Sequence, residues 1–146
     1  MIREIKFRGK DICTGEWVVG YFVGTTDNVA TIIPINNVNY DIGYVGESEC
    51  SYCDTNTVGQ FTGLYDKNGN EIYEGNILRY ERYGWESKPL VVEFKHGAFG
   101  YTYEETDCFI PFASNVNFDF NPYDKDINFE IIGDIHDNPE LLKGGK

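Results

Sequence analysis

A Cys-x-x-Cys pair is the spacing in this chain of 146 residues that most resembles a metal-binding or redox motif. Cys50 and Cys53 would supply half of a four-thiolate zinc site, and Cys13 and Cys108 could complete it. Cys13 and Cys108 do not form a second Cys-x-x-Cys pair, however, which a strong zinc signal would need. A thiol redox centre needs its motif at the start of a helix, whereas this one lies among Gly, Asn and Ser residues. The sequence therefore favours four unlinked thiols, with no bound metal and no cofactor.

Two other groups of polar residues have the types, but not the spacing, of a functional site. Residues 66–70 begin like an EF-hand calcium loop, which needs Gly at its sixth position and Glu at its twelfth. This chain has Glu71 and Ile77 there. A turn and an acidic surface are enough to account for the positions of His96 and His136, so neither residue indicates a catalytic site. We therefore expect no catalytic residue, and an enzyme whose site is not visible in the sequence stays an alternative.

Aromatic side chains offer a route to function that needs no catalysis. The chain has 11 Tyr and 10 Phe, and exposed rings on a small barrel can stack bases or bind proline-rich peptides. Most of these rings should fill and cover the core. The possible interaction surface that we expect consists of Trp17, Tyr21, Tyr80 and Tyr83. Further aromatic candidates are Phe61, Tyr65 and Tyr73.

The stretch of residues 57–83 organises the predicted fold. It contains three strand-like runs, at residues 60–65, 71–73 and 76–83. Asn68 and Gly69 between the first two favour a type I′ turn, because both central positions of that turn take positive φ. Gly75 predicts a second bend.

Alternating apolar and polar residues predict strands on both sides of this stretch. On the N-terminal side they are residues 2–8, 17–23 and 29–35, with Pro34 restricted to an edge. Residues 36–56 form an irregular excursion. On the C-terminal side, residues 90–95 and 99–103 form a hairpin around His96 and Gly97, and residues 129–135 form the last strand. Residues 109–112 and 115–120 are short strands or irregular segments, and Pro139 begins one short C-terminal helix.

The same turn signals carry a resemblance to a known family. The runs GQFTGL (59–64), DKNG (66–69) and EIYEG (71–75) resemble the YopX-like family of small phage and prophage proteins. An opening IKFRGK followed by TGEWV, and a closing IGDI followed by DNPELL, agree with it. The resemblance spans nearly the whole chain and implies a mainly β fold with SH3-like barrel character and a phage origin. It implies no catalytic residues. Asn76 stands where we expect the family to carry Asp.

Length and charge limit the remaining possibilities. At 146 residues, we expect a single domain over residues 1–146. A net charge of −12 indicates a solvated surface or, more narrowly, mimicry of nucleic-acid charge, and it disfavours binding to nucleic acid. A nucleic-acid-associated module would need the basic residues within 3–10 and 79–95 to converge. No run is apolar enough for a signal peptide or a membrane span, so we expect the host cytoplasm.

Together these features predict a mainly β protein, a small SH3-like barrel or pseudo-barrel with hairpins and one short C-terminal helix. The expected function is that of a non-catalytic accessory protein that binds another protein of unknown identity or associates with itself. Exposed strand edges and apolar patches are commonly covered in symmetric oligomers. We therefore expect a homodimer or larger oligomer that tightens as salt screens its negative charge.

Overall fold

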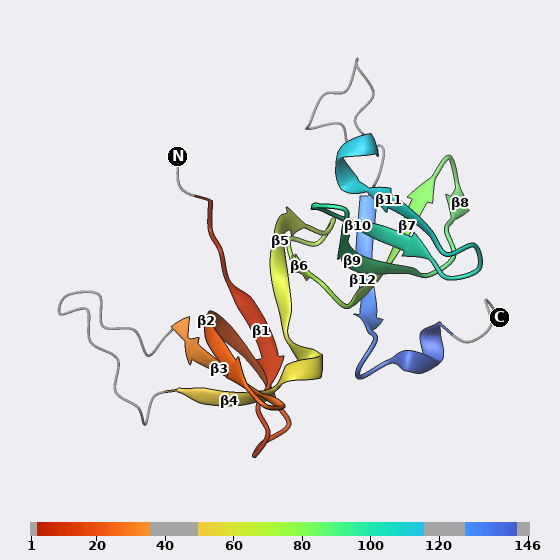
Figure 1. The fold of residues 1–146 in the computed structure, drawn as a ribbon. Helices are drawn as coiled ribbons and strands as arrows, with labels where there is room; N and C mark the ends of the chain where they lie inside the picture. Colours follow the sequence, from red (N-terminus) through yellow and green to blue (C-terminus); the bar gives the residue numbers. More distant parts are fainter. Residues whose placement is uncertain (1–2, 36–49, 116–127, 143–146) are drawn as a thin grey trace. The chain divides into compact units, whose positions relative to one another are not determined.

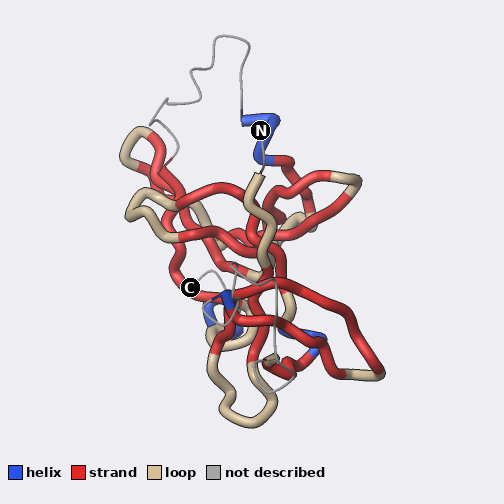
Figure 2. The backbone as a smooth tube through the Cα atoms, turned by 90° about the vertical axis from the view of Figure 1, so that its left-hand side faces the viewer, coloured by secondary structure: helices blue, strands red, loops and turns tan. Residues whose placement is uncertain are grey.

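Strands make up most of the structure, as the composition predicts. The computed structural model describes residues 3–35, 50–115 and 128–142. The chain divides into two compact units, an N-terminal unit (Met1–Gly63) and a C-terminal unit (Leu64–Lys146). Figure 2 shows strands, in red, along most of both, and the described residues contain short 3-10 helices but no α-helix. The prediction of one domain stays a prediction.

The strands of the N-terminal unit form one antiparallel sheet (Figure 1). They are β1 (Phe7–Lys10), β2 (Trp17–Thr26), β3 (Val29–Pro34), β4 (Ser51–Asp54) and β5 (Gly59–Tyr65). Hydrogen-bonded neighbours follow the order β4-β3-β2-β1-β5. The residues after β1 then reach the other edge of β4, because Asp11 bridges to Cys53 and the N–H of Ile12 donates to the carbonyl of Tyr52 at 2.8 Å. The sheet therefore curves back on itself.

The core of this unit lies on the inner face of the curved sheet. It contains Ala30, Ile32 and Cys53, which are fully buried, and Phe7, Val18 and Val58, which pack around them. β2 and β3 approach so closely that a Cβ at Gly20 would lie 1.9 Å from the carbonyl oxygen of Ile33. Only glycine fits at that position without separating the strands.

The C-terminal unit contains a second antiparallel sheet, in the order β11-β10-β9-β7-β12. Its strands are β7 (Asn76–Arg82), β8 (Trp85–Glu86), β9 (Leu90–Lys95), β10 (Ala98–Tyr103), β11 (Cys108–Pro111) and β12 (Asn128–Asp134). β7 pairs with β9 at its start and with β8 at its end, while β12 pairs with β7 as far as Glu81. β5 crosses the division between the units. β6 (Glu71–Tyr73) comes next to β5 in the strand order of the first sheet.

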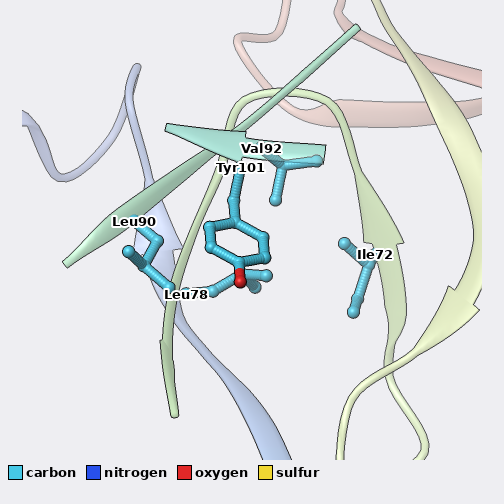
Figure 3. Close-up of a cluster of buried hydrophobic side chains, with 5 residues drawn as sticks. All are labelled: Ile72, Leu78, Leu90, Val92 and Tyr101. Carbon is cyan, nitrogen blue, oxygen red and sulfur yellow. The ribbon is translucent and has the colours of Figure 1, made fainter. Parts of the chain in front are cut away.

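One tyrosine lies at the centre of the C-terminal core. Figure 3 shows the ring of Tyr101 among the side chains of Ile72, Leu78, Leu90 and Val92, which come from β6, β7 and β9. Further rings pack around it, with ring centroids 5.4 Å away at Phe129 and 5.6 Å away at Phe112. Such tilted aromatic contacts stabilise a core beyond the area that they bury. Five of the chain's Tyr and Phe residues meet in this core.

The turn between β5 and β6 differs from the predicted type I′ turn. Gly69 has a φ of +84°, but Asn68 is not among the residues with positive φ. The loop contains five residues, and the N–H of Gly69 donates to the carbonyl of Asp66 at 3.0 Å. This is the pattern of a type I turn followed by a left-handed glycine. Type I′ turns are instead formed by Tyr83–Gly84 and His96–Gly97, in which both residues have positive φ.

The predicted C-terminal helix is wrong, because the described residues contain only a 3-10 helix, η5 (Pro139–Leu141), at this position. Its N-terminal residue Asn138 makes no side-chain cap, since its Oδ1 accepts a hydrogen bond from the N–H of Asp134 at 3.2 Å. The Asp134 carboxylate in turn accepts from the N–H groups of His136 and Asp137, both at 2.8 Å. These bonds hold the segment as a turn, and an uncapped helix this short is not favoured.

Two predicted boundaries also change. The excursion predicted over residues 36–56 contains β4, whose residues are alternately buried and exposed, and the 3-10 helix η3 (Thr55–Thr57) follows it. The Gly and Asn residues before β4 obscured this period of two; residues 36–49 lie outside the described residues. The strand predicted over residues 2–8 begins only at Phe7. Of the segment predicted over residues 115–120, only Asn115 is described, at the end of the 3-10 helix η4 (Phe112–Asn115).

Candidate functional site

A buried carboxylate holds the β5–β6 turn to the distant strand β12. Asp66 is only 6% exposed, and its Oδ1 accepts hydrogen bonds from the N–H groups of Asn68 at 2.9 Å and Asn70 at 2.8 Å. Its Oδ2 accepts from the N–H of Ile131 at 3.2 Å. Burial raises the pKa of Asp66, but the hydrogen bonds outweigh it and hold this pKa below its ordinary value. The carboxylate is therefore a structural anion.

The bend between β6 and β7 is fixed in a similar way. Asn76 is 3% exposed, and its Oδ1 accepts a hydrogen bond from the N–H of Tyr73 at 2.7 Å. Gly75, with a φ of +86°, donates its N–H to the carbonyl of Val92 and accepts from the N–H of Ile135, both at 2.9 Å. A neutral amide supplies the buried acceptor without burying a charge, which explains how Asn serves where we expected Asp.

The cysteines lie in dissimilar surroundings. Cys53 is buried, Cys50 is half-buried, and Cys13 and Cys108 are exposed. Residues three apart on an extended chain point to opposite faces, so the Cys50–Cys53 spacing does not make one site here. Burial raises the pKa of the Cys53 thiol, which disfavours the reactive thiolate. Within the described residues no three His, Cys, Asp or Glu side chains group to hold a metal ion. Absence of zinc stays a prediction, which elemental analysis tests.

Two of the aromatic residues predicted at an interaction surface lie on β2. The Trp17 ring is half-buried, with the guanidinium of Arg8 4.2 Å and the ammonium of Lys10 5.4 Å from its centroid. Tyr21 is exposed. Among the further candidates, Phe61 and Tyr73 are buried, and Tyr65 is exposed. Some of these rings therefore pack in a core or make cation–π contacts, and others lie at the surface.

The β7–β8 hairpin carries the most exposed large apolar side chains of the described residues. Tyr83 is 84% exposed and Trp85 is 81% exposed. Tyr83 and Gly84 form the turn, with φ of 52° and 79°. At the base, the Tyr80 hydroxyl lies 2.9 Å from that of Tyr103, and the Tyr80 ring packs against the core. Figure 1 shows the hairpin at the edge of the C-terminal unit. An anchored hairpin therefore presents two rings to solvent.

The basic residues around this hairpin whose side chains the structure describes lie beside carboxylates. Arg79 contacts Glu130 at 3.1 Å and Glu86 at 3.5 Å. The Arg79 guanidinium, followed by the charge of Lys67, lowers the pKa of Glu130. The other ion pairs here are Lys67–Glu130 at 3.4 Å, Lys95–Glu93 at 3.0 Å and Lys88–Glu105. Cations that are already paired have less charge to offer an anionic ligand.

Comparisons with known proteins identify the family. The family model described as YopX protein matches residues 6–143. This chain belongs to the YopX family. It is also similar to a solved structure, the crystal structure of protein EF1440 from Enterococcus faecalis, with 26% sequence identity and a TM-score of 0.57. That match covers 97% of this chain and 100% of the other. The search of the curated proteins gave no match.

In this YopX-family chain, the polar residues of the runs DKNG and EIYEG with the following Asn are used by the fold. Asp66 and Asn76 are buried acceptors of backbone N–H groups, and Gly69 and Gly75 supply the left-handed turns. The motif runs that carry the family resemblance therefore contain the residues that form these turns. Trp85 was not selected from the sequence, because the strand that the sequence predicts over residues 76–83 ends at Tyr83. The signal was present, since an aromatic residue followed by Gly and a second aromatic residue continues the alternation across a two-residue turn.

The N-terminal unit of this YopX-family chain also has a surface hollow with both polar and apolar lining residues. Its volume is about 610 Å³, and it lies between the turns that follow β1, β2 and β4. Carboxylates at its wall hold two of those turns: Asp11 accepts from the N–H of Cys13 at 2.8 Å after β1, and Asp54 accepts from the N–H of Asn56 at 3.0 Å after β4. No helix among the described residues has both the length and the apolar character to cross a membrane.

Proposed function

We propose that this YopX-family protein is a non-catalytic phage or prophage accessory protein that acts by binding another protein. The observation that carries the proposal is the exposure of Tyr83 and Trp85 at the end of a hairpin whose base is packed in the core. Tyrosine and tryptophan provide much of the binding energy at protein interfaces, and they provide most when they are held in place before binding. The end of the β7–β8 hairpin carries a tyrosine and a tryptophan, and its packed base holds them in place before binding.

The motif residues support a role without catalysis. Asp66 and Asn76 would be candidates for acid–base chemistry by type, but both are buried and hydrogen-bonded to backbone N–H groups. A general acid or base must instead reach a substrate. Their use in the turns leaves surface recognition as the function that the described residues favour.

The charge distribution favours a protein over a nucleic acid as the partner. Binding to phosphates gains affinity when free cations release counterions. Of the basic residues within 79–95 that the nucleic-acid alternative needs, the three whose side chains the structure describes, Arg79, Lys88 and Lys95, each contact a carboxylate. Acidic residues also outnumber basic residues two to one in each unit. A phosphate backbone would meet net repulsion at either.

The proposal also includes the type of barrel and the place in the cell where the protein acts. The curved part of the first sheet, from β4 to β5, with residues 11–12 bonded to β4, supports an SH3-like barrel or pseudo-barrel. Such barrels are frequent carriers of binding surfaces. The protein would act in the host cytoplasm, and self-association into a homo-oligomer stays a prediction. Sedimentation at increasing salt tests it, and a monomer at high salt would contradict it.

Quantitative affinity purification tests the proposed function. Tagged wild type, Trp85→Ser and Phe94→Ser are expressed in the bacterium that carries the gene, and the co-purifying proteins are measured by mass spectrometry. Phe94 is the matched control, since it is an exposed aromatic residue of the same sheet at 52%. We expect one protein in near-stoichiometric amount with wild type and Phe94→Ser, and its loss with Trp85→Ser. An identical set of proteins for all three would refute the proposal.

A further inference from the structure

The β5–β6 turn contains two neighbouring residues that can react with each other. Asn68 is the asparagine of this sequence that glycine follows. In such a pair the backbone nitrogen of the glycine can attack the side-chain carbonyl of the asparagine, because glycine has no Cβ to crowd the approach. Asn68 and Gly69 are both exposed, and no atom lies within 4 Å of a Cβ built on Gly69. A five-membered ring therefore has room to form there.

One of the two reacting groups can move in the folded protein, and the other is held. The side-chain amide of Asn68 is exposed and makes no hydrogen bond with the residues that the structure describes. The N–H of Gly69, whose nitrogen would attack, donates to the carbonyl of Asp66 at 3.0 Å. The N–H groups of Asn68 and Asn70 on either side donate to the Asp66 carboxylate. The attack therefore requires this turn to open.

We propose that Asn68 is a site of spontaneous deamidation and that the hydrogen bonds of Asp66 set its rate. The Gly69 nitrogen forms a bond to Cγ of Asn68, the bond from Cγ to the side-chain nitrogen breaks, and ammonia leaves with the proton from Gly69. Water then opens the succinimide ring at either carbonyl and leaves aspartate or isoaspartate at position 68. The reaction consumes only water, so it needs no enzyme and no cofactor.

The product loosens the attachment of the turn to β12. Isoaspartate carries the main chain through its side-chain carbon, which adds one main-chain atom between residues 68 and 69. One oxygen of Asp66 accepts from the N–H groups of Asn68 and Asn70, on both sides of that link. Either product also places a second negative charge close to the buried Asp66 carboxylate. Because the same carboxylate accepts from the N–H of Ile131 at 3.2 Å, the modification weakens the bond between the turn and β12.

Peptide mapping by mass spectrometry measures the reaction in the full-length chain, kept in mildly alkaline buffer. Rates at position 68 are compared for folded wild type, wild type unfolded in urea, Asp66→Asn, and Asp107→Asn as an exposed turn control. We expect the unfolded chain to react fastest, Asp66→Asn at least about fivefold faster than folded wild type, and Asp107→Asn within about twofold of it. Asn70 is the internal control, since it lies in the same turn but precedes Glu71.

Equal rates in folded and unfolded wild type, or an Asn70 that reacts as fast as Asn68, would overturn the proposal. Hydrogen exchange keeps the test valid if Asp66→Asn does not fold. In urea below the wild-type midpoint, modification at position 68 should accelerate in step with exchange at the Gly69 amide, and a constant rate would refute control by the turn. In the isolated isoaspartate form, exchange at the Ile131 amide should exceed that of the unmodified chain, and equal exchange would refute the loosening of β12.

Discussion

Replacing Asp66 by Asn should loosen the attachment of the β5–β6 turn to β12. The change preserves size and removes one acceptor oxygen and the charge. In the wild-type protein, the carboxylate accepts from the backbone N–H groups of Asn68, Asn70 and Ile131. An amide can present oxygen to one side only, so its NH₂ group would face at least one of these N–H donors. The substitution therefore leaves a buried donor unpaired.

The expected cost follows from these contacts. An unpaired buried N–H costs about 1–3 kcal/mol, and hydrogen bonds to a charged acceptor are roughly twice as strong as neutral ones. Losing one bond and the charge in the others gives about 2–4 kcal/mol for Asp66→Asn. Because Asp66 has a lowered pKa in the folded protein, its contribution is present above the ordinary Asp pKa of about 3.9. It is lost as the pH falls through the lower folded value.

Urea denaturation followed by circular dichroism measures this cost, with Asp107→Asn as the control. Asp107 is an exposed turn residue with a φ of 51°, which Asn tolerates well, so its substitution should change the unfolding free energy by less than about 0.5 kcal/mol. Hydrogen exchange at the Ile131 amide should accelerate in Asp66→Asn, and the difference from wild type should shrink below about pH 4. Equal midpoints for both variants, or unchanged exchange at Ile131, would refute the reasoning.

Three further predictions concern single positions. Gly69→Val should lower the unfolding free energy by about 1–3 kcal/mol through backbone strain alone, since its φ is +84° and no atom lies within 4 Å of a Cβ there; an unchanged urea midpoint would contradict this. Gly100→Ala should reduce the melting temperature more than Gly69→Val, because its Cβ would lie 2.3 Å from the carbonyl oxygen of Ile110. Burial, followed by the bond to Tyr80, raises the pKa of Tyr103, so stability should fall as the pH rises above about 10, and Tyr103→Phe should reduce that fall in alkaline urea titrations.

The sequence was sufficient for the parts of the fold that local patterns determine. Alternation placed β9 and β10, and the turn at His96 and Gly97 between them is the two-residue turn that the structure contains. The motif runs identified the family and the mainly β class. The detail of the β5–β6 turn was not predictable, because the carboxylate of Asp66 is bound by Ile131, a residue 65 positions away. A dipeptide signal contains no information about such a partner.

The candidate site was only partly predictable. Tyr80 and Tyr83 were both expected at the surface; Tyr80 packs against the core, whereas Tyr83, in the turn of its hairpin, is exposed. Alternation along β7 cannot show that its pairing with β9 stops at Leu78 and that β8 pairs with its last residues instead. Trp85 lies in the last pair of this hairpin, past the end of β12, so its exposure depends on where the neighbouring strands stop.

Hydrogen–deuterium exchange of the protein with and without its purified partner tests the central claim most directly. Amides that a binding surface covers exchange more slowly in the complex. If the protein binds through its aromatic hairpin, protection should appear at residues 80–87, with the N-terminal unit unchanged. Protection confined to the N-terminal unit, with residues 80–87 exchanging as in the free protein, would contradict the account.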